Sequence, residues 1–274
     1  MQPKLKGFNG IKVHRDFLYI DILGFSQMVR GHSAKIPQVF EIIDELSVHE
    51  HYDFHAIVFS DTIIVYNKNE NKPSHYYVTY LIEFAQQLFY RLLSIGGYFR
   101  GLITYGEFEF HEHDNIQAYW GNALIDTYTD ESNIEGFGLF IRKDISKDIL
   151  IFEKMSVSVN YDFVFLCQSY MNLYKRVHGE LPISLDLLTE TDEFDRIGDD
   201  LKFFREISFL KEHHTNEKIK EKYRTVYSWY KERTPKFFKS FEEQGFFPFV
   251  LNPGYFDSIN PFETIAEQEL TTNK

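Results

Sequence analysis

The chain has 274 residues, 43% of them hydrophobic and 18% aromatic, which is enough apolar material for a large core and excludes a disordered polypeptide. Its formal net charge of −12 argues against nucleic-acid partners and anionic membrane surfaces. Cys167 is the only cysteine, so intrachain disulfides are excluded, and its apolar neighbours predict a buried thiol. Because no signal peptide and no apolar run of about 20 residues is recognisable, we expect a cytoplasmic protein without a membrane span.

The first half of the chain alternates strand-like apolar runs with helical stretches. The β-rich runs "FHAIVF" and "TIIVYN" are separated only by Ser60 and Asp61, which predicts a tight hairpin. In chain order, the expected elements are a strand at 16–23, a turn at Gly24 into a short helix, a helix over 37–50, strands at 54–59 and 62–67, a helix from 74 that ends at Gly96 and Gly97, strands at 99–110 and 116–120, and a helix over 121–132. This order predicts an α+β fold with a ferredoxin-like core, in which helices back an antiparallel sheet.

The second half is less regular. Strands are expected within 136–145 and 161–168, and a charged helical stretch over 194–233 is expected to stop at Pro235. That stretch has an apolar stripe that should pack on the body of the protein or on a second subunit, formed by Leu201, Phe204, Ile207 and Leu210. The aromatic segment 246–262 must also pack onto other residues. We therefore expect a core domain over 1–180 and a mostly helical extension over 181–274.

Two aspartates lie where the pattern does not expect them. Asp21 falls inside the apolar strand "FLYIDIL", and an isolated ionised carboxylate there is costly unless it has a partner. That partner could be a buried arginine, Arg100 or Arg15. Asp61, taken alone, is an ordinary turn aspartate. If the hairpin tip approaches Asp21, however, the two carboxylates and a backbone carbonyl suit a hard divalent cation.

A glycine turn follows Asp21 directly. In "ILGFS" the chain turns at Gly24 into a helix, whose first backbone amides favour phosphate oxygens. Carboxylates that hold metal ions beside a phosphate-binding turn form the two-metal arrangement used to attack a nucleotide phosphate.

Four segments in this order resemble the class III nucleotidyl cyclases. They are "YIDILGFS", "FSDTIIVY" (with Ser60 where glycine is usual), "RGLITYG" and "YWGNALIDTYTDE", which together cover roughly residues 15–145. Each motif is weak alone, but four in the right order are fairly specific. The combination of "G-x-A-L-I-D-x-Y" with the "F-S-D" hairpin is most similar to the bacterial pyrimidine cyclases of Pycsar anti-phage systems.

The departures from the purine-specific pattern concern the base and the ribose. Ile57 stands where purine cyclases have a lysine, and Ala118 stands where they have a base-selecting aspartate. Ile125 and Thr129 replace the family's ribose-orienting asparagine and transition-state arginine. The resemblance therefore implies conversion of UTP or CTP to a 3′,5′-cyclic monophosphate and pyrophosphate, and a separate effector that senses the product.

The resemblance also implies roles for individual residues. Asp21, Asp61 and the Ile22 carbonyl would hold two Mn²⁺ or Mg²⁺ ions, and Arg100 or Arg142 would replace the missing transition-state arginine. The β- and γ-phosphates would be bound by the amides of Leu23, Gly24, Phe25 and Ser26. A homodimer would share its active sites, with residues 118–129 acting in trans. The base and ribose pocket would comprise Tyr52, Ile57, Phe59, Ala118, Tyr119, Asn122 and Ile125.

Other readings remain open at this point. The chain could be a catalytically silent cyclase-like dimer that binds a nucleotide or a partner, or it could be a purine cyclase. The sequence does not separate UTP from CTP and carries no sign of what activates the enzyme.

Overall fold

The computed structural model describes residues 13–184 and 194–254. The chain forms two compact units, residues 1–166 and 167–274. The boundary expected after residue 180 lies inside the second unit, because α6 (Gln168–Arg176) is bonded to α8 (Phe194–His213) through the Asp200 carboxylate, which accepts the backbone N–H of Tyr170 at 2.8 Å. None of the described helices is long and apolar enough to cross a membrane.

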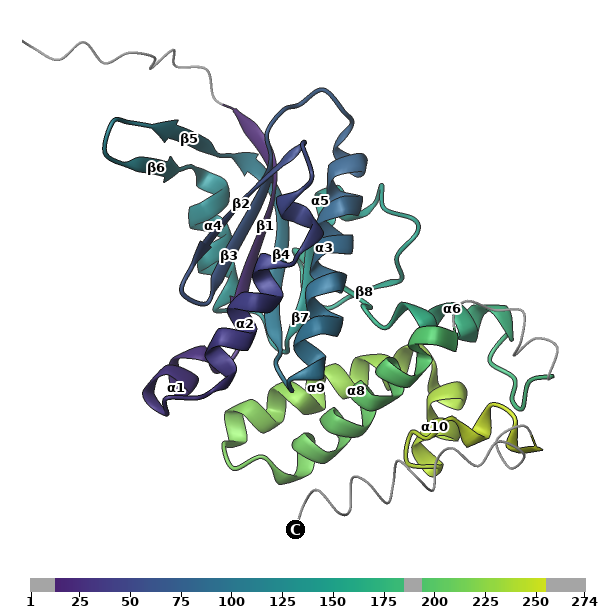
Figure 1. Ribbon diagram of the computed structural model, residues 1–274. Helices are drawn as coiled ribbons and strands as arrows, with labels where there is room; N and C mark the ends of the chain where they lie inside the picture. Colours follow the sequence, from purple (N-terminus) through teal and green to yellow (C-terminus); the bar gives the residue numbers. More distant parts are fainter. Residues whose placement is uncertain (1–12, 185–193, 255–274) are drawn as a thin grey trace, which may run out of the picture. The chain divides into compact units, whose positions relative to one another are not determined.

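The first unit is built on a mostly antiparallel sheet backed by helices (Figure 1). Its strand order is β2-β3-β1-β4-β7-β9-β8, and β5 and β6 form a separate pair. The elements are β1 His14–Ile22, α1 Phe25–Arg30, α2 Lys35–Asp44, η1 Ser47–His49, β2 Phe54–Phe59, β3 Thr62–Asn67, α3 Ser74–Ser94, β4 Phe99–Glu107, β5 Glu109–Glu112, β6 Gln117–Trp120, α4 Asn122–Glu131, β7 Gly138–Arg142, α5 Lys143–Ser146, β8 Lys154–Ser156 and β9 Tyr161–Val164. The expected α+β, ferredoxin-like core is confirmed.

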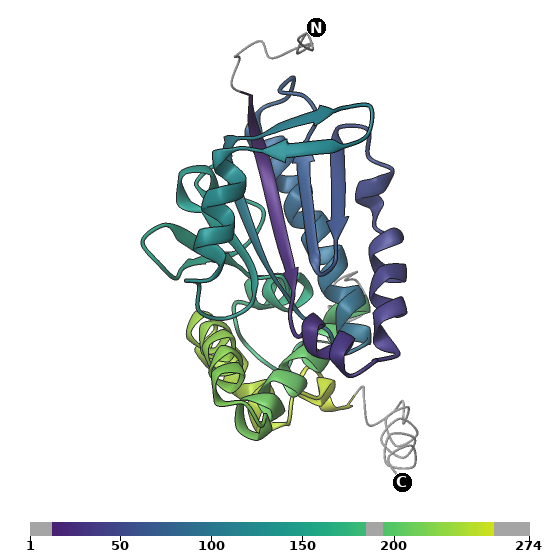
Figure 2. The ribbon, with the colours of Figure 1, turned by 90° about the vertical axis from the view of Figure 1, so that its left-hand side faces the viewer.

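Strand β1 is buried on both faces because it lies between β3 and β4 and is covered from both sides. Phe17 and Tyr19 point to the face that carries α4, where they pack in one cluster with Ala123. Leu18 and Ile20 alternate to the other face, where α3 lies. Figures 1 and 2 show α3 and α4 on opposite sides of the sheet.

Two expected elements are divided in the structure. The helix expected over 37–50 is α2 followed by the short turn η1, and the strand expected over 99–110 is β4 followed by β5. The second break occurs at Phe108, whose buried ring packs 4.9 Å from that of Phe17 and whose N–H donates to the Val13 carbonyl at 2.9 Å. The chain therefore leaves the main sheet there, and β5 pairs with β6 instead.

A buried carboxyl on β1 should make stability depend on pH. Asp16 is 2% exposed and accepts a 2.5 Å hydrogen bond from Ser74, and burial raises its pKa to about 6, although the Ser74 bond opposes the rise. The unfolded chain thus loses this proton first, so stability should fall by about 2–3 kcal/mol as the pH rises from about 4 to about 6, and then level off. Asp16→Asn should remove most of that slope in urea titrations, whereas the exposed control Asp148→Asn should keep it. An unchanged slope in Asp16→Asn would contradict this assignment.

The second unit is helical in its described part. It contains α6, α8, α9 (Glu217–Arg233), α10 (Pro235–Glu243) and η2 (Pro248–Val250). The stretch expected over 194–233 is therefore two helices, and it stops before Pro235 as expected, because α9 ends at Arg233. Pro235 then begins α10, since proline suits the first helical turn. Of the predicted stripe, Leu201, Phe204 and Ile207 are buried. Cys167 is buried as expected, and burial raises the pKa of its thiol well above the ordinary value.

Aromatic rings fill the core of this unit. Tyr170 lies 4.9 Å from Phe204 and 5.1 Å from Phe237, measured between ring centroids. The expectation that the aromatic segment 246–262 packs down holds for its described part, where Phe246 and Leu251 are buried in the unit; residues 255–262 lie outside the described residues.

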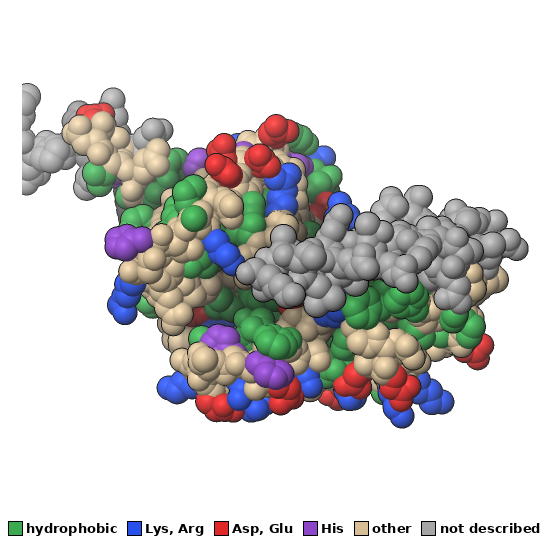
Figure 3. Space-filling view, turned by 60° about the horizontal axis from the view of Figure 1, so that its bottom comes forward, with side chains coloured by type: hydrophobic (Ala, Val, Ile, Leu, Met, Phe, Trp, Pro, Cys, Tyr) green, Lys and Arg blue, Asp and Glu red, His purple; other side chains and the backbone are tan. Residues whose placement is uncertain are grey.

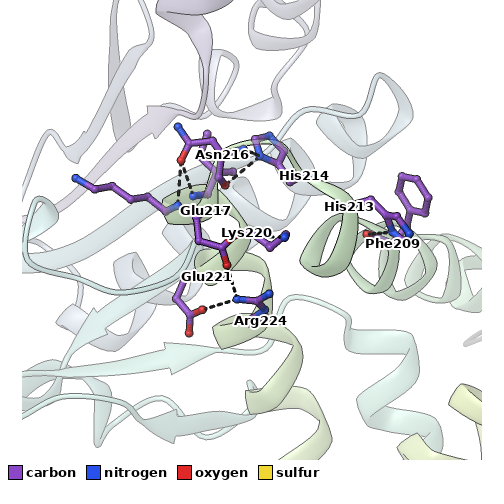
Figure 4. A network of polar contacts seen from close by, with 10 residues as sticks. Phe209, His213, His214, Asn216, Glu217, Lys220, Glu221 and Arg224 are labelled. Carbon is purple, nitrogen blue, oxygen red and sulfur yellow. Dashed lines mark hydrogen bonds and ion pairs between the residues drawn. The ribbon is translucent and has the colours of Figure 1, made fainter.

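Charged side chains in the first half of α9 pair with one another (Figure 4). Arg224 bonds both Glu217 and Glu221, and the side chain of Asn216 caps the helix by accepting the N–H groups of Lys218 and Ile219. Along the lower edge of Figure 3, acidic and basic side chains are interspersed. The surface of α9 at Glu217, Glu221 and Arg224 is therefore one of mixed charge.

Candidate functional site

The hairpin tip lies against the end of β1. The Cα register places Asp21 opposite Thr62 of β3, and the Ile22 N–H donates to the Asp61 carbonyl at 3.0 Å. The neighbour of β1 in the sheet is thus β3, which follows the Ser60–Asp61 turn, and not β2, which precedes that turn. The structure therefore places the backbone of Asp61, in the hairpin turn, beside the end of β1 that carries Asp21.

The surroundings of Asp21 combine β1, β3 and α4. Tyr19, two residues earlier on the same face, is hydrogen-bonded to the Thr62 side chain. Burial raises the pKa of Tyr19, and the charges of Asp21 and Glu131 raise it further. The last turn of α4 is therefore close to the same end of β1.

The two arginines considered as partners of Asp21 are placed differently. Arg15 lies near the other end of β1, opposite Gly106, and burial lowers its pKa. Arg100 is the cross-strand neighbour of Asp21, but its guanidinium is directed elsewhere. It binds the Glu131 carboxylate at 2.5 Å, the Glu131 carbonyl at 2.7 Å and the Gly136 carbonyl at 3.1 Å.

The contacts of Arg100 give it a structural role. Its side chain is 5% exposed, and its donors join β4 to the end of α4 and the loop that follows. Arg142, the other candidate, binds Asp144 at 2.7 Å and the Tyr105 carbonyl at 2.5 Å. Both guanidinium groups therefore hold the fold together.

The turn after Asp21 has the expected glycine conformation. Gly24 has φ 76°, a left-handed value that favours glycine, and α1 begins at the next residue. The Leu23 N–H already donates to the Tyr98 carbonyl at 2.9 Å, so this amide is not free for a phosphate as expected. The Phe25 and Ser26 amides open the helix, where N–H groups have no acceptor within the helix.

The predicted two-residue hairpin turn is confirmed by the pairing of Phe59 with Thr62. Ser60 has φ 58°, which is costly for a residue with a side chain. Ser60→Gly should stabilise the first unit by about 0.5 kcal/mol. This value is the left-handed strain that glycine relieves, minus the extra conformational entropy that glycine gives to the unfolded chain. Ser60→Ala, which keeps the strain, should show no gain in the same chemical denaturation experiment. A gain in both variants would mean that φ is not the cause.

The predicted pocket residues do not all lie together within one chain. Ile57 and Tyr119 pack around one apolar cluster on the α4 face of the sheet, while Phe59 is 79% exposed beside the hairpin turn. Tyr52 stacks on His51 before the start of β2, at the opposite end of that strand from Asp61. Tyr52 is therefore remote from the hairpin tip within one chain, contrary to the expectation.

The β6–α4 segment accounts for the remaining pocket residues. Ala118 pairs with His111 on β5, and Asn122 lies 3.4 Å from the Glu107 carboxylate, both near the start of β1. Between them Gly121 has φ 149°, and a Cβ there would lie 2.1 Å from the Glu107 carbonyl oxygen, so only glycine fits. Ile125 projects from α4 and is 63% exposed.

The described residues contain no group of three or more His, Cys, Asp or Glu placed to hold one metal ion. Asp21 and Asp61 are the candidate carboxylate ligands at this end of β1. They are hard oxygen donors of the kind that Mg²⁺ and Mn²⁺ accept, usually with water and substrate phosphates completing the coordination.

No family model and no curated protein sequence matches the chain. Among solved structures, it is similar to the adenylyl cyclase CyaB from P. aeruginosa, with 14% identity over 56% of this chain and 93% of that chain and a TM-score of 0.42. The guanylyl cyclase domain of the RhoGC fusion protein from Blastocladiella emersonii shows 12% identity over 56% of this chain and 95% of that chain, with a TM-score of 0.45. At these values the likeness carries no residue role, substrate or activity across to this chain.

Proposed function

We propose that the protein is a nucleotidyl cyclase that converts UTP or CTP to the 3′,5′-cyclic monophosphate and pyrophosphate. The observation that carries this proposal is the hydrogen bond from the Ile22 N–H to the Asp61 carbonyl, which joins the hairpin tip to the strand end that holds Asp21. The backbone positions of Asp21 and Asp61 and the glycine turn thus lie within a few residues of this bond, which supports a site built from both carboxylates. This is the set of groups that attack on a nucleotide phosphate requires.

The reaction is an intramolecular displacement. The ribose 3′-oxygen loses its proton and attacks the α-phosphorus, and the bond to the β-phosphate oxygen breaks to release pyrophosphate. Asp21 and Asp61, with the Ile22 carbonyl, would hold Mn²⁺ or Mg²⁺, which when bound supplies acidification of the 3′-hydroxyl and neutralisation of the leaving group. The amides of Gly24, Phe25 and Ser26 are the remaining candidates for the β- and γ-phosphates.

The proposed substrate follows from the side chains of Ile57 and Ala118. Ile57 is apolar and packs on Tyr66, so no lysine is available there to bind the edge of a purine. Ala118 likewise offers no polar side-chain atom. A site that lacks hydrogen-bonding groups for a purine edge loses its means of selecting one, and bulky neighbours favour the smaller base.

A homodimer would complete the site. Within one chain, Ala118 and Asn122 lie near the start of β1, whereas Asp21 lies at its end, and the nine residues of β1 span about 30 Å. Residues 118–129 of a second copy could reach the metal end of the first, and the exposed Ile125 and Tyr128 of α4 favour such a contact. Mixing Asp21→Asn chains with Asn122→Trp chains should then restore part of the activity.

Substrate preference tests the proposal most directly. Purified protein with Mn²⁺ and all four triphosphates in competition should form cyclic UMP or cyclic CMP as the main product, measured by mass spectrometry. Cyclic AMP or cyclic GMP as the main product would overturn the pyrimidine assignment but keep the cyclase. The resemblance of the motifs to the pyrimidine cyclases implies that the product would be a messenger for a separate effector in anti-phage defence.

The ion pairs of Arg100 with Glu131 and of Arg142 with Asp144 favour a second candidate, a cyclase-like module that binds a nucleotide without turnover. Equilibrium dialysis with Mn²⁺ and labelled UTP separates the two. Saturable binding with no cyclic product over hours would favour the silent module.

A further inference from the structure

A groove lies between α2 and the outer edge of β2, away from the α4 face. It measures about 430 Å³ and is lined by Pro37, Phe40, Glu41, Ile43, Asp44, His49 and Val58. Figure 2 shows α2 running alongside this edge of the sheet. Four of the lining residues are apolar, and the charged ones among them are carboxylates.

Strand β2 offers unpaired backbone groups to this groove. It ends the sheet, so none of the described strands pairs with its outer side. Phe59 and Thr62 close the two-residue turn as a hydrogen-bonded pair, and the alternation of the antiparallel ladder then turns the N–H and C=O of Val58 outward. The Val58 side chain is 37% exposed and lines the groove. An open strand edge beside an apolar slot suits an extended peptide that adds a strand.

The charge of the groove selects the kind of peptide. Glu41 and Asp44 are exposed on α2. The wall next to them is held in place, because the imidazole Nε2 of His49 lies 2.8 Å from the Ile43 carbonyl oxygen. A peptide that places Lys or Arg at the rim and apolar side chains in the slot is complementary to this surface.

The groove also touches both loops of the proposed active site. The Phe40 ring meets the Phe25 ring edge to face at 5.9 Å, and Phe25 is the first residue after the glycine turn. Val58 lies on the strand that leads directly into Ser60 and Asp61. A peptide bound here contacts the elements that position the turn and the hairpin.

We propose that this groove binds an extended segment of a partner protein, apolar at alternate positions and rich in Lys or Arg, as an added strand on β2. We further infer that occupancy alters turnover at the Asp21–Asp61 edge, a part that rests on the proposed function.

Fluorescence anisotropy with a labelled Lys-Val-Lys-Val-Lys-Val-Lys peptide tests the binding. The wild type should bind saturably, and the charge reversal Glu41→Lys/Asp44→Lys should weaken binding by about tenfold. The control Asp114→Lys/Asp148→Lys, which changes the net charge equally at exposed sites elsewhere, should bind like the wild type. Equal loss in both double variants, equal binding of a Glu-Val peptide, or no saturable binding would overturn the proposal.

A proline at the strand edge tests the mode of binding. Val58→Pro removes an N–H that points outward and leaves the hydrogen bonds to β3 intact, so it should weaken the peptide by about tenfold. Val58→Ala, which keeps the N–H, should weaken it less. Unchanged affinity in Val58→Pro, with a circular dichroism spectrum like that of the wild type, would overturn strand addition.

Turnover with saturating peptide tests the coupling. The rate should change by about fivefold or more in the wild type and stay constant in Glu41→Lys/Asp44→Lys. Saturable binding with an unchanged rate would overturn the coupling. A complete lack of cyclisation under all conditions would instead contradict the proposed function, and with it the coupling. The anisotropy experiment would still decide whether the groove binds the peptide.

Discussion

Replacing either Asp21 or Asp61 by asparagine is expected to lower cyclisation of a pyrimidine triphosphate by about a thousandfold or more, because metal-assisted displacement loses several kcal/mol of barrier lowering when one carboxylate is removed. Asparagine keeps the size of the side chain, so the sheet edge should remain intact. Asp21 lies opposite Thr62 and beside the Ile22–Asp61 hydrogen bond, and that bond uses backbone atoms only. The expected loss is therefore one of chemistry and not of folding.

Metal binding provides a readout that does not depend on turnover. Mn²⁺ should raise the thermal unfolding midpoint of the wild type in the presence of a nonhydrolysable triphosphate, and it should do so much less for either variant. Without metal, the variants should be as stable as the wild type or slightly more so, because two like charges become one. The matched control is Asp148→Asn, at an exposed position in the same unit. Normal product formation by Asp21→Asn or Asp61→Asn would remove the metal assignment.

Arg100→Met is expected to cost about 3–5 kcal/mol of unfolding free energy, because it leaves the Glu131 carboxylate poorly solvated and without its cation. The Glu131 side chain is 18% exposed, and the guanidinium also binds two backbone carbonyls, those of Glu131 and Gly136. Removing one partner of such a network is more damaging than replacing both with apolar groups. Urea denaturation at neutral pH measures the loss.

Two further variants separate a structural arginine from a catalytic one. Glu131→Gln keeps a hydrogen-bond acceptor and should cost about 1 kcal/mol, and Arg100→Met/Glu131→Leu should recover part of the loss seen in Arg100→Met. If Arg100 acted on the substrate instead, Arg100→Met would unfold like the wild type and lose turnover. That result would restore the role that the sequence motif implies.

Local patterns were sufficient for the framework of the site. The alternation along β1, the two-residue gap between "FHAIVF" and "TIIVYN", and Gly24 each concern residues that are neighbours in the chain. Their conformations depend on nearby atoms, so they could be read directly: a strand with Asp21 near its end, a tight turn carrying Asp61, and a left-handed glycine. The order of the elements then limited the fold to a helix-backed antiparallel sheet.

Tertiary structure decided which of these residues meet. Only the tertiary contacts show that the Arg100 guanidinium turns to Glu131 and that the Leu23 amide donates to the Tyr98 carbonyl. These outcomes depend on hydrogen bonds between residues that are distant in sequence, and one position of strand slip would send every side chain to the other face. The sequence by itself therefore determined the elements and the carboxylates, whereas packing determined which polar groups bind one another within the fold.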